Sequence, residues 1–276
     1  MIQINEILEN NITNDEITIK TCPICGKPYK VQDITILGKV RKMQFANCEC
    51  EEIELKRQEQ EKEAQAKFEY RRKKTEEIKA SLNCPLVTPF FRDKTFDKIQ
   101  KVAGADDYNK MYDYCVNFAK EFNPKTTAGM LMIGNVGSGK TTLQACICNE
   151  LTKRGYNCLL TTFSALLDEL FDVSSYEVKD KSVTKVLNAL AQFDYIVIDD
   201  LGREKYTEKR LENAFKIFDT LYNYKVCTSI TANKECLQKV FAIPEFNAIT
   251  DRITDICPTR LKFNNKTFRG CNCKEI

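Results

Sequence analysis

The chain has 276 residues, of which 43% are hydrophobic and 29% charged, and its formal net charge is +3. These proportions are typical of a folded soluble protein, and the length suits one medium-sized domain with an appendage. The nearly balanced charge excludes nucleic-acid binding that rests on overall charge, so any such contact must come from a local patch. No signal peptide or membrane-spanning run is recognisable, so we expect a cytoplasmic protein without a membrane partner.

The chain contains fourteen cysteines and no histidine, which limits its metal chemistry. Most cysteines lie in segments predicted to be buried strands and helices of a chain without an export signal, so we expect reduced thiols rather than disulfides. Most of them then serve as small apolar core side chains. A zinc site must be built from cysteine or carboxylate, and no histidine can act as a general base.

Two cysteine pairs, separated by a predicted hairpin over residues 29–45, mark residues 1–52 as a small zinc-binding domain. The four candidate Zn²⁺ ligands are Cys22, Cys25, Cys48 and Cys50. A two-residue spacing followed by Gly26 is typical of a zinc knuckle, whereas the one-residue spacing of the second pair is unusual, and unpaired thiols are the alternative. Four protein ligands leave no position for water, so the zinc would be structural. Because so small a module depends on its metal to fold, we expect a docking surface.

Residues 53–84 predict a charged helical linker. From residue 53 to residue 82 they contain no Gly or Pro and few apolar side chains, which favours a solvated helix, and Cys84 and Pro85 end it. The basic run at residues 71–74 is a candidate nucleic-acid contact, with an ordinary solvated face as the alternative that charge runs favour.

Residues 85–276 alternate between predicted strands and helices, which indicates an α/β domain with a parallel sheet and helices on both faces. The predicted strands are residues 130–133, 157–162, 194–200 and 226–231. The predicted helices are residues 106–122, 164–171, 183–191 and 207–222, together with a helix that begins near Leu143 and ends at Gly155. Residues 172–182 are expected to form an exposed insertion.

Residues 134–142 fit the phosphate-loop pattern of a glycine, four residues, then Gly-Lys-Thr, between a predicted strand and a predicted helix. The loop consists of Gly134, Asn135, Val136, Gly137, Ser138, Gly139, Lys140, Thr141 and Thr142. Its backbone N–H groups and the following helix N-terminus can hold phosphate. We expect Lys140 to reach the β- and γ-phosphates and the Thr141 hydroxyl to ligate Mg²⁺. A glycine-rich turn without a ligand is the alternative.

Polar residues follow two further predicted strands. Asp199 and Asp200 end one strand, and Asn233 follows another. In an open parallel sheet, ligands gather beyond the carboxyl ends of the strands, so we expect these side chains near the phosphate loop. Asp199 would hold Mg²⁺, Asp200 would orient or deprotonate the attacking water, and Asn233 would position the same water. A helix cap or a plain turn is the alternative for these residues.

Four segments occur in the order seen in AAA+ ATPases. They are residues 134–142, residues 195–202 with their Asp-Asp-Leu-Gly ending, residues 229–233, and residues 251–253 followed by 267–269. Over residues 85–276 the chain resembles the DnaC/DnaI-like bacterial and phage helicase loaders, which are close to the IstB transposition ATPases. The N-terminal cysteine pattern resembles the zinc-binding, helicase-contacting domain of DnaI-like loaders.

This resemblance implies an AAA+ P-loop domain that binds ATP and Mg²⁺ and hydrolyses ATP. Arg252 resembles the arginine finger that one subunit inserts beside the ATP of its neighbour, so homo-oligomer formation on ATP binding would gate hydrolysis; a helix-surface cation is the alternative. Asp200 stands where many AAA+ proteins have Glu, and either Arg260 or Arg269 would be the second sensor. Slow or partner-stimulated hydrolysis would fit these departures. The segment 91–96 resembles the entry to the AAA+ core near the adenine.

The implied function is an ATP-dependent loader that binds a replicative DNA helicase and helps place it on single-stranded DNA. An IstB-like regulator of transposition and a nucleotide-switched, non-enzymatic adaptor are the alternatives. Candidate single-strand contacts, each with solvated surface as the alternative, are Lys179, Lys181, Arg203, Lys205 and Tyr206.

Overall fold

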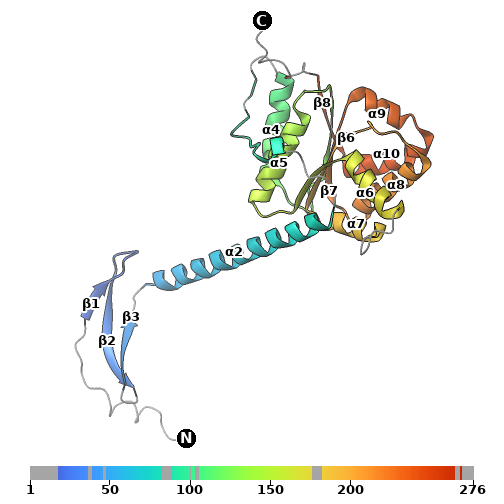
Figure 1. The fold of residues 1–276 in the computed structure, drawn as a ribbon. Coiled ribbons are helices and arrows are strands. Elements are labelled where there is room, and N and C mark those ends of the chain that lie inside the picture. Colours follow the sequence, from blue (N-terminus) through green and yellow to red (C-terminus); the bar gives the residue numbers. More distant parts are fainter. Residues whose placement is uncertain are drawn as a thin grey trace. The chain divides into compact units, whose positions relative to one another are not determined.

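The computed structural model describes residues 18–36, 39–45, 48–82, 89–99, 101–102, 106–175, 182–264 and 268, with the elements in Figure 1. The chain divides into two compact units, Met1–Lys67 and Phe68–Ile276. The functions that the sequence suggests for residues 1–52, 53–84 and 85–276 stay predictions.

The first unit contains a three-stranded antiparallel sheet. Its strands are β1 (Thr18–Thr21), β2 (Pro28–Ile36) and β3 (Lys39–Phe45), in the order β1-β2-β3. The hairpin expected over residues 29–45 is therefore confirmed, whereas β1 was not predicted. The register places Lys30 opposite Phe45, so the strand that follows the first cysteine pair runs beside the strand that precedes the second.

Helix α2 (Cys50–Ser81) confirms the predicted long polar helix, but one side of its last turns is buried. Thr75, Ile78 and Leu82 are buried, and both apolar side chains belong to the core of the second unit. The prediction of a solvated helix was wrong at these positions, because two apolar residues four positions apart make a narrow stripe that average composition hides. The basic run at residues 71–74 is exposed.

The second unit is built on a five-stranded sheet in which every neighbouring pair is parallel, as the alternating pattern predicted. Its strands are β4 (Met130–Gly134), β5 (Cys158–Thr162), β6 (Tyr195–Leu201), β7 (Cys227–Ala232) and β8 (Thr259–Phe263). Their order is β5-β6-β7-β4-β8. Strand β8 was not predicted, and it pairs with β4 along its whole length.

Helices cover both faces of this sheet (Figure 1). They are α3 (Pro89–Arg92), α4 (Asp106–Glu121), α5 (Lys140–Lys153), α6 (Phe163–Ser175), α7 (Val183–Leu190), α8 (Glu208–Asn223), α9 (Lys234–Phe241) and α10 (Asn247–Ile256), with the 3-10 helix η1 (Pro244–Phe246). Helices α4 and α5 pack on one face, and α6 to α8 and α10 pack on the other. Met130 and Met132 of β4 pack in the core between the sheet and helices α4 and α5, whereas Leu131 packs in the core on the opposite face of the sheet. This alternation is expected of a strand that is buried on both sides.

Some elements of the second unit differ from those that the sequence predicts. Helix α6 continues to Ser175, so residues 172–175 are helical rather than part of an exposed insertion, and residues 176–181 lie outside the described residues. Helices α9 and α10 and the 3-10 helix were not predicted.

Among the residues that the structure describes, no helix combines the length and apolar character needed to cross a membrane.

The described cysteines are all free thiols, as expected. Six of those in the second unit are buried in its core, namely Cys115, Cys146, Cys148, Cys158, Cys227 and Cys257. Burial raises the pKa of the Cys146 thiol to about 12, so this group stays protonated and apolar at neutral pH. Cys84, Cys271 and Cys273 lie outside the described residues.

Candidate nucleotide and metal sites

A pocket of about 700 Å³ lies beyond the carboxyl ends of β4, β6 and β7. Its lining includes residues 136–142 of the phosphate loop together with Asp199, Asp200 and Asn233. Because β7 lies between β4 and β6, Asn233 sits between the phosphate loop and the two acids. The volume is within the range of small-molecule and cofactor sites, which is about 300–1,000 Å³. The side chains predicted from three separate motifs therefore meet in one cavity.

The phosphate loop has the backbone geometry that anion binding requires. Gly137 and Gly139 have φ values of 77° and 93°, in the left-handed region that favours glycine. A Cβ at Gly139 would lie 2.8 Å from the ring of Tyr108, so a side chain has no room there. Helix α5 begins at Lys140, directly after Gly139, which places a helix N-terminus at the loop. The loop therefore fits a phosphate chain.

The Lys140 ammonium is folded onto this loop. Its side chain is buried, and Nζ donates to the carbonyl oxygens of Gly134 at 2.9 Å and Asn135 at 2.8 Å. Nζ also lies 3.4 Å from the Ser138 hydroxyl oxygen. These acceptors hydrogen-bond a charge that would otherwise be costly to bury. A bound phosphate oxygen can replace them, since Lys140 lines the pocket.

The carboxylate of Asp199 connects three elements. Its Oδ1 accepts hydrogen bonds from the Thr141 hydroxyl at 2.9 Å and from the Thr231 hydroxyl. Burial raises the pKa of Asp199, and the two hydroxyl donors partly oppose this shift. Mg²⁺ prefers oxygen ligands and usually binds one or two carboxylates together with substrate phosphates, so the neighbouring Thr141 and Asp199 fit the predicted magnesium position.

Thr231 is a site residue whose role the sequence did not reveal. Its hydroxyl donates to Asp199 and accepts the backbone N–H of Asp200 at 3.1 Å. The register between β6 and β7 shifts at Ile198, and Asp200 has a φ of 58°. The shift resembles a β-bulge, which re-aims side chains near functional sites. Thr231 lies within the motif at residues 229–233, but only the pairing of β6 with β7 shows what it contacts.

Asp200 and Asn233 share a partner, Arg203. Asp200 Oδ2 lies 3.0 Å from Arg203 Nη1. With its amide oriented to satisfy both neighbours, Asn233 donates to the Gly134 carbonyl oxygen at 3.2 Å and accepts from Arg203 Nη2 at 3.2 Å. Arg203 lines the pocket, although the sequence suggested it only as a DNA contact. The residues expected to orient water are therefore linked by a guanidinium group.

Aromatic side chains form an apolar wall of the same pocket. Phe91, Tyr108 and Phe268 line it, and the rings of Tyr108 and Phe268 meet edge to face with centroids 4.9 Å apart. The amide of Asn149 on α5 donates to the carbonyl oxygens of Phe91 at 2.9 Å and Lys94 at 2.7 Å. This ties the segment 91–96 to the helix of the phosphate loop. Its expected position near the adenine stays a prediction.

Arg252 lies outside this pocket. On α10, its Nη2 is 2.7 Å from Asp219 Oδ1, and its guanidinium centre is 4.4 Å from the centroid of the Phe215 ring. An arginine finger acts on a neighbouring subunit, so this position leaves the prediction open. Arg260 is exposed on β8, whereas Arg269 lies outside the described residues, so the second sensor also stays a prediction.

The candidate DNA contacts of the loop after β6 do not form one exposed patch. Tyr206 is half-buried, its hydroxyl donates to Glu204 at 3.0 Å, and its ring packs on Phe246. This ring is therefore not free to stack on bases, whereas Lys205 is exposed. Lys179 and Lys181 lie outside the described residues.

The four predicted zinc ligands come together in the first unit. The Sγ atoms of Cys22, Cys25, Cys48 and Cys50 all lie within 4.8 Å of one another. Backbone N–H groups of Cys25 and Ile24 lower the pKa of Cys22 to about 7. The contact with Cys25 raises the pKa of Cys50 to about 12. Four crowded thiols with a turn of amide donors form a donor set that fits Zn²⁺, so this cluster could hold zinc.

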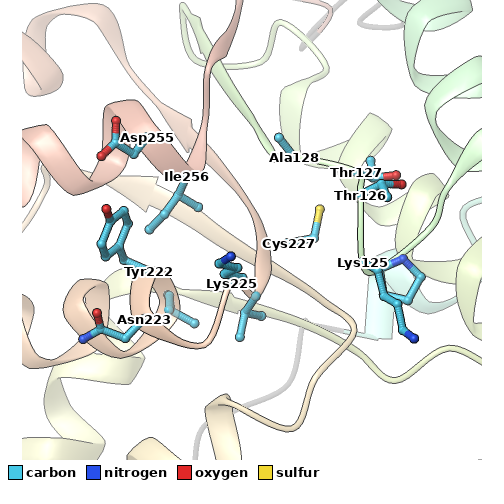
Figure 2. A pocket seen from close by; sticks show the side chains of 14 residues that line it. Lys125, Thr126, Thr127, Ala128, Tyr222, Asn223, Lys225, Cys227, Asp255 and Ile256 are labelled. Carbon is cyan, nitrogen blue, oxygen red and sulfur yellow. The ribbon is translucent and has the colours of Figure 1, made fainter.

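A second pocket, of about 420 Å³, lies at the amino-terminal ends of the strands and is lined by residues that precede β4 and β7 (Figure 2). Its lining includes Lys125, Tyr222, Lys225 and Asp255. None of the residues predicted to bind nucleotide or metal lines this second pocket, and the two pockets have no lining residue in common.

Replacing Thr231 with Val should weaken Mg²⁺-dependent nucleotide binding about tenfold, since Asp199 loses a donor and the Asp200 N–H loses its acceptor. Removing a donor raises the pKa of the Asp199 carboxyl, and Mg²⁺ requires the ionised form. The pH at which half of the Mg²⁺-dependent binding is lost should therefore move upward, as measured by titrating fluorescent ATP at several pH values. Thr228→Val is the matched control, because the Thr228 hydroxyl on the same strand bonds to the Val226 carbonyl oxygen. Equal effects of both changes would contradict the role of Thr231.

Purified protein should contain one zinc ion per chain, and Cys25→Ser should lose it, as measured by elemental analysis. Zinc affinity should fall as pH falls, because Cys48 and Cys50, whose pKa values are raised, must release protons to bind the metal. Cys236→Ser, at a half-buried cysteine outside the cluster, is the control. Zinc that is retained in Cys25→Ser and lost in Cys236→Ser would show that the cluster is not the site.

Known proteins are similar to this chain in sequence and in fold. The replicative helicase loader DnaC of Escherichia coli (strain K12) is 30% identical over 118 residues, which are 42% of this chain and 46% of that protein. The replicative helicase loader DnaI of Bacillus subtilis (strain 168) is 26% identical over 98 residues, which are 35% of this chain and 30% of that protein. The match thus spans at most about half the length of these curated relatives.

A crystal structure of the DnaC helicase loader aligns with a TM-score of 0.54 and 21% identity, covering 64% of this chain and 99% of that chain. This likeness, together with the parallel sheet, confirms the expected AAA+ fold. The model of the IstB-like ATP binding protein family matches residues 119–274, which is more than half of the chain and includes the phosphate loop, both acids and Asn233. The chain belongs to this family of IstB-like ATP binding proteins.

Proposed function

We propose that this protein is an ATP-dependent loader that binds a replicative DNA helicase and helps place it on single-stranded DNA. The observation that supports this most is the meeting of Lys140, Thr141 and Asp199 in one pocket, in a chain similar to the replicative helicase loader DnaC. A built nucleotide pocket supplies the means for an ATP-controlled step, and the similarity to loaders suggests what that step acts on.

In the proposed ATPase site, the backbone N–H groups of the phosphate loop and the N-terminus of α5 hold the phosphates. Lys140 would exchange its carbonyl contacts for phosphate oxygens, and Thr141 and Asp199 would hold Mg²⁺. When bound, this ion would neutralise charge that develops on the phosphates. Asp200 and Asn233 orient the attacking water. Asp200 is one methylene shorter than Glu, so we expect slow or partner-stimulated hydrolysis.

The cysteine cluster would stabilise a docking module for the helicase. Structural zinc contributes directly to the folding of small domains, so losing the metal should remove the module's surface together with its fold. Partner binding would thus be a task of the first unit, and nucleotide-dependent assembly a task of the second.

An IstB-like regulator of transposition is the second candidate, favoured by the family model that matches residues 119–274. It would share the ATPase site and differ in its partner, a transposase on duplex DNA. A nucleotide-switched adaptor without hydrolysis is the third candidate. ATP turnover with and without single-stranded DNA separates the adaptor from the other two.

Wild-type protein should bind ATP with Mg²⁺, and Lys140→Ala should bind ATP about 100-fold more weakly, because the ammonium that would contact two phosphates is removed.

In affinity capture from extract of the native host, wild type should retain the replicative helicase, and Cys25→Ser should not. Recovery of a transposase without helicase would reject the loader in favour of the second candidate. Equal ATP binding by wild type and Lys140→Ala would reject the nucleotide site itself.

If Arg252 acts across subunits, mixing Arg252→Ala with Lys140→Ala should restore part of the ATPase activity that each variant lacks alone. One interface of the mixed assembly then combines an intact pocket with an intact Arg252. Because Arg252 also pairs with Asp219, Asp219→Asn is the control for loss of that ion pair. Full activity of Arg252→Ala alone, or no recovery on mixing with both variants folded, would argue against the finger.

A further inference from the structure

Arg203 occupies a position in the nucleotide pocket that the phosphate-loop and acid motifs do not explain. Its guanidinium binds Asp200 Oδ2 at 3.0 Å and Asn233 Oδ1 at 3.2 Å. The Asn233 amide in turn donates to the carbonyl oxygen of Gly134, the first residue of the phosphate loop. Arg203 is thus connected, through one side chain, to the loop that would hold the phosphates.

The loop that carries Arg203 is held by its own packing. The Glu204 carboxylate accepts the Gly202 backbone N–H at 3.0 Å and the Tyr206 hydroxyl at 3.0 Å. Tyr206 packs against Phe246 with ring centroids 5.4 Å apart. The backbone on both sides of Arg203 is therefore anchored to the core, and the guanidinium is presented to the pocket before any nucleotide binds.

Charge in the pocket favours a phosphate partner for this guanidinium. Among the described residues that line the pocket, Lys140 and Arg203 are the cations, and Asp199 and Asp200 are the acids. Lys140 lies on the phosphate loop, whereas Arg203 lies beside the two side chains expected to face the attacking water. Water attacks the γ-phosphate, so a cation bonded to both groups lies on the γ-phosphate side of the site. Arginine presents several N–H donors in a fixed plane that matches phosphate oxygens.

We propose that Arg203 binds the γ-phosphate of ATP within its own chain and so makes the site prefer ATP over ADP; this rests on the proposed nucleotide-binding function. On ATP binding, the guanidinium exchanges its contact with Asp200 for γ-phosphate oxygens. The exchange frees the Asp200 carboxylate to accept a hydrogen bond from water. With ADP there is no γ-phosphate, so Arg203 stays paired with Asp200.

The affinities of Mg²⁺ complexes of a non-hydrolysable ATP analogue and of ADP should be measured by calorimetry on the full chain. Arg203→Ala should reduce the preference for the ATP analogue over ADP about 10- to 100-fold, almost wholly through weaker binding of the analogue. Arg203→Lys, which keeps the charge but not the planar donors, should retain an intermediate preference. Lys205→Ala is the matched control, since Lys205 is an exposed cation of the same loop that does not line the pocket.

An unchanged preference in both Arg203 variants, with ATP analogue and ADP still bound, would overturn the assignment while leaving the nucleotide site intact. An equal loss of preference in Lys205→Ala would also overturn it, because the effect would then come from general surface charge. Wild-type protein that binds neither nucleotide would instead reject the proposed function on which the inference rests.

Discussion

The hydrogen-bonded carboxylate of Asp199 is the constraint on which the nucleotide pocket depends. It lies near the carboxyl end of β6, accepts from Thr141 on α5 and from Thr231 on β7, and is half-buried. A carboxylate that is partly removed from water needs donors or cations to satisfy it, so these contacts hold the helix of the phosphate loop against two strands. The same hydroxyl of Thr231 receives the Asp200 N–H and thereby sets the backbone from which Asp200 reaches the pocket.

Around that carboxylate, Lys140 and Arg203 each have acceptors within the protein. Lys140 is held by loop carbonyl oxygens, and Arg203 is held by Asp200 and Asn233. Each cation therefore has an internal partner that an anionic ligand can replace. Both cations are therefore hydrogen-bonded within the protein itself. The family membership and the AAA+ fold are consistent with such a nucleotide-responsive site.

The two units are stabilised by different physical means. Among its described residues, the first buries few side chains and gathers four thiols, an arrangement that a divalent metal ion would stabilise. The second buries an extensive apolar core on both faces of its parallel sheet. Helix α2 shows why composition alone misleads, since most of its surface is polar and yet Ile78 is part of that core.

The amino-acid sequence alone was enough to predict the phosphate loop, the adjacent acids near the end of β6 and the cysteine pairs, because each depends on residues that are close together in the chain. It also predicted the parallel sheet, since alternation of strands and helices is a local pattern. The fold was needed to show the strand order that places Asn233 between the loop and the acids, the contacts of Thr231, and the contact between Arg203 and Asn233. Those depend on register and on packing between distant segments, which no spacing of residues along the chain encodes.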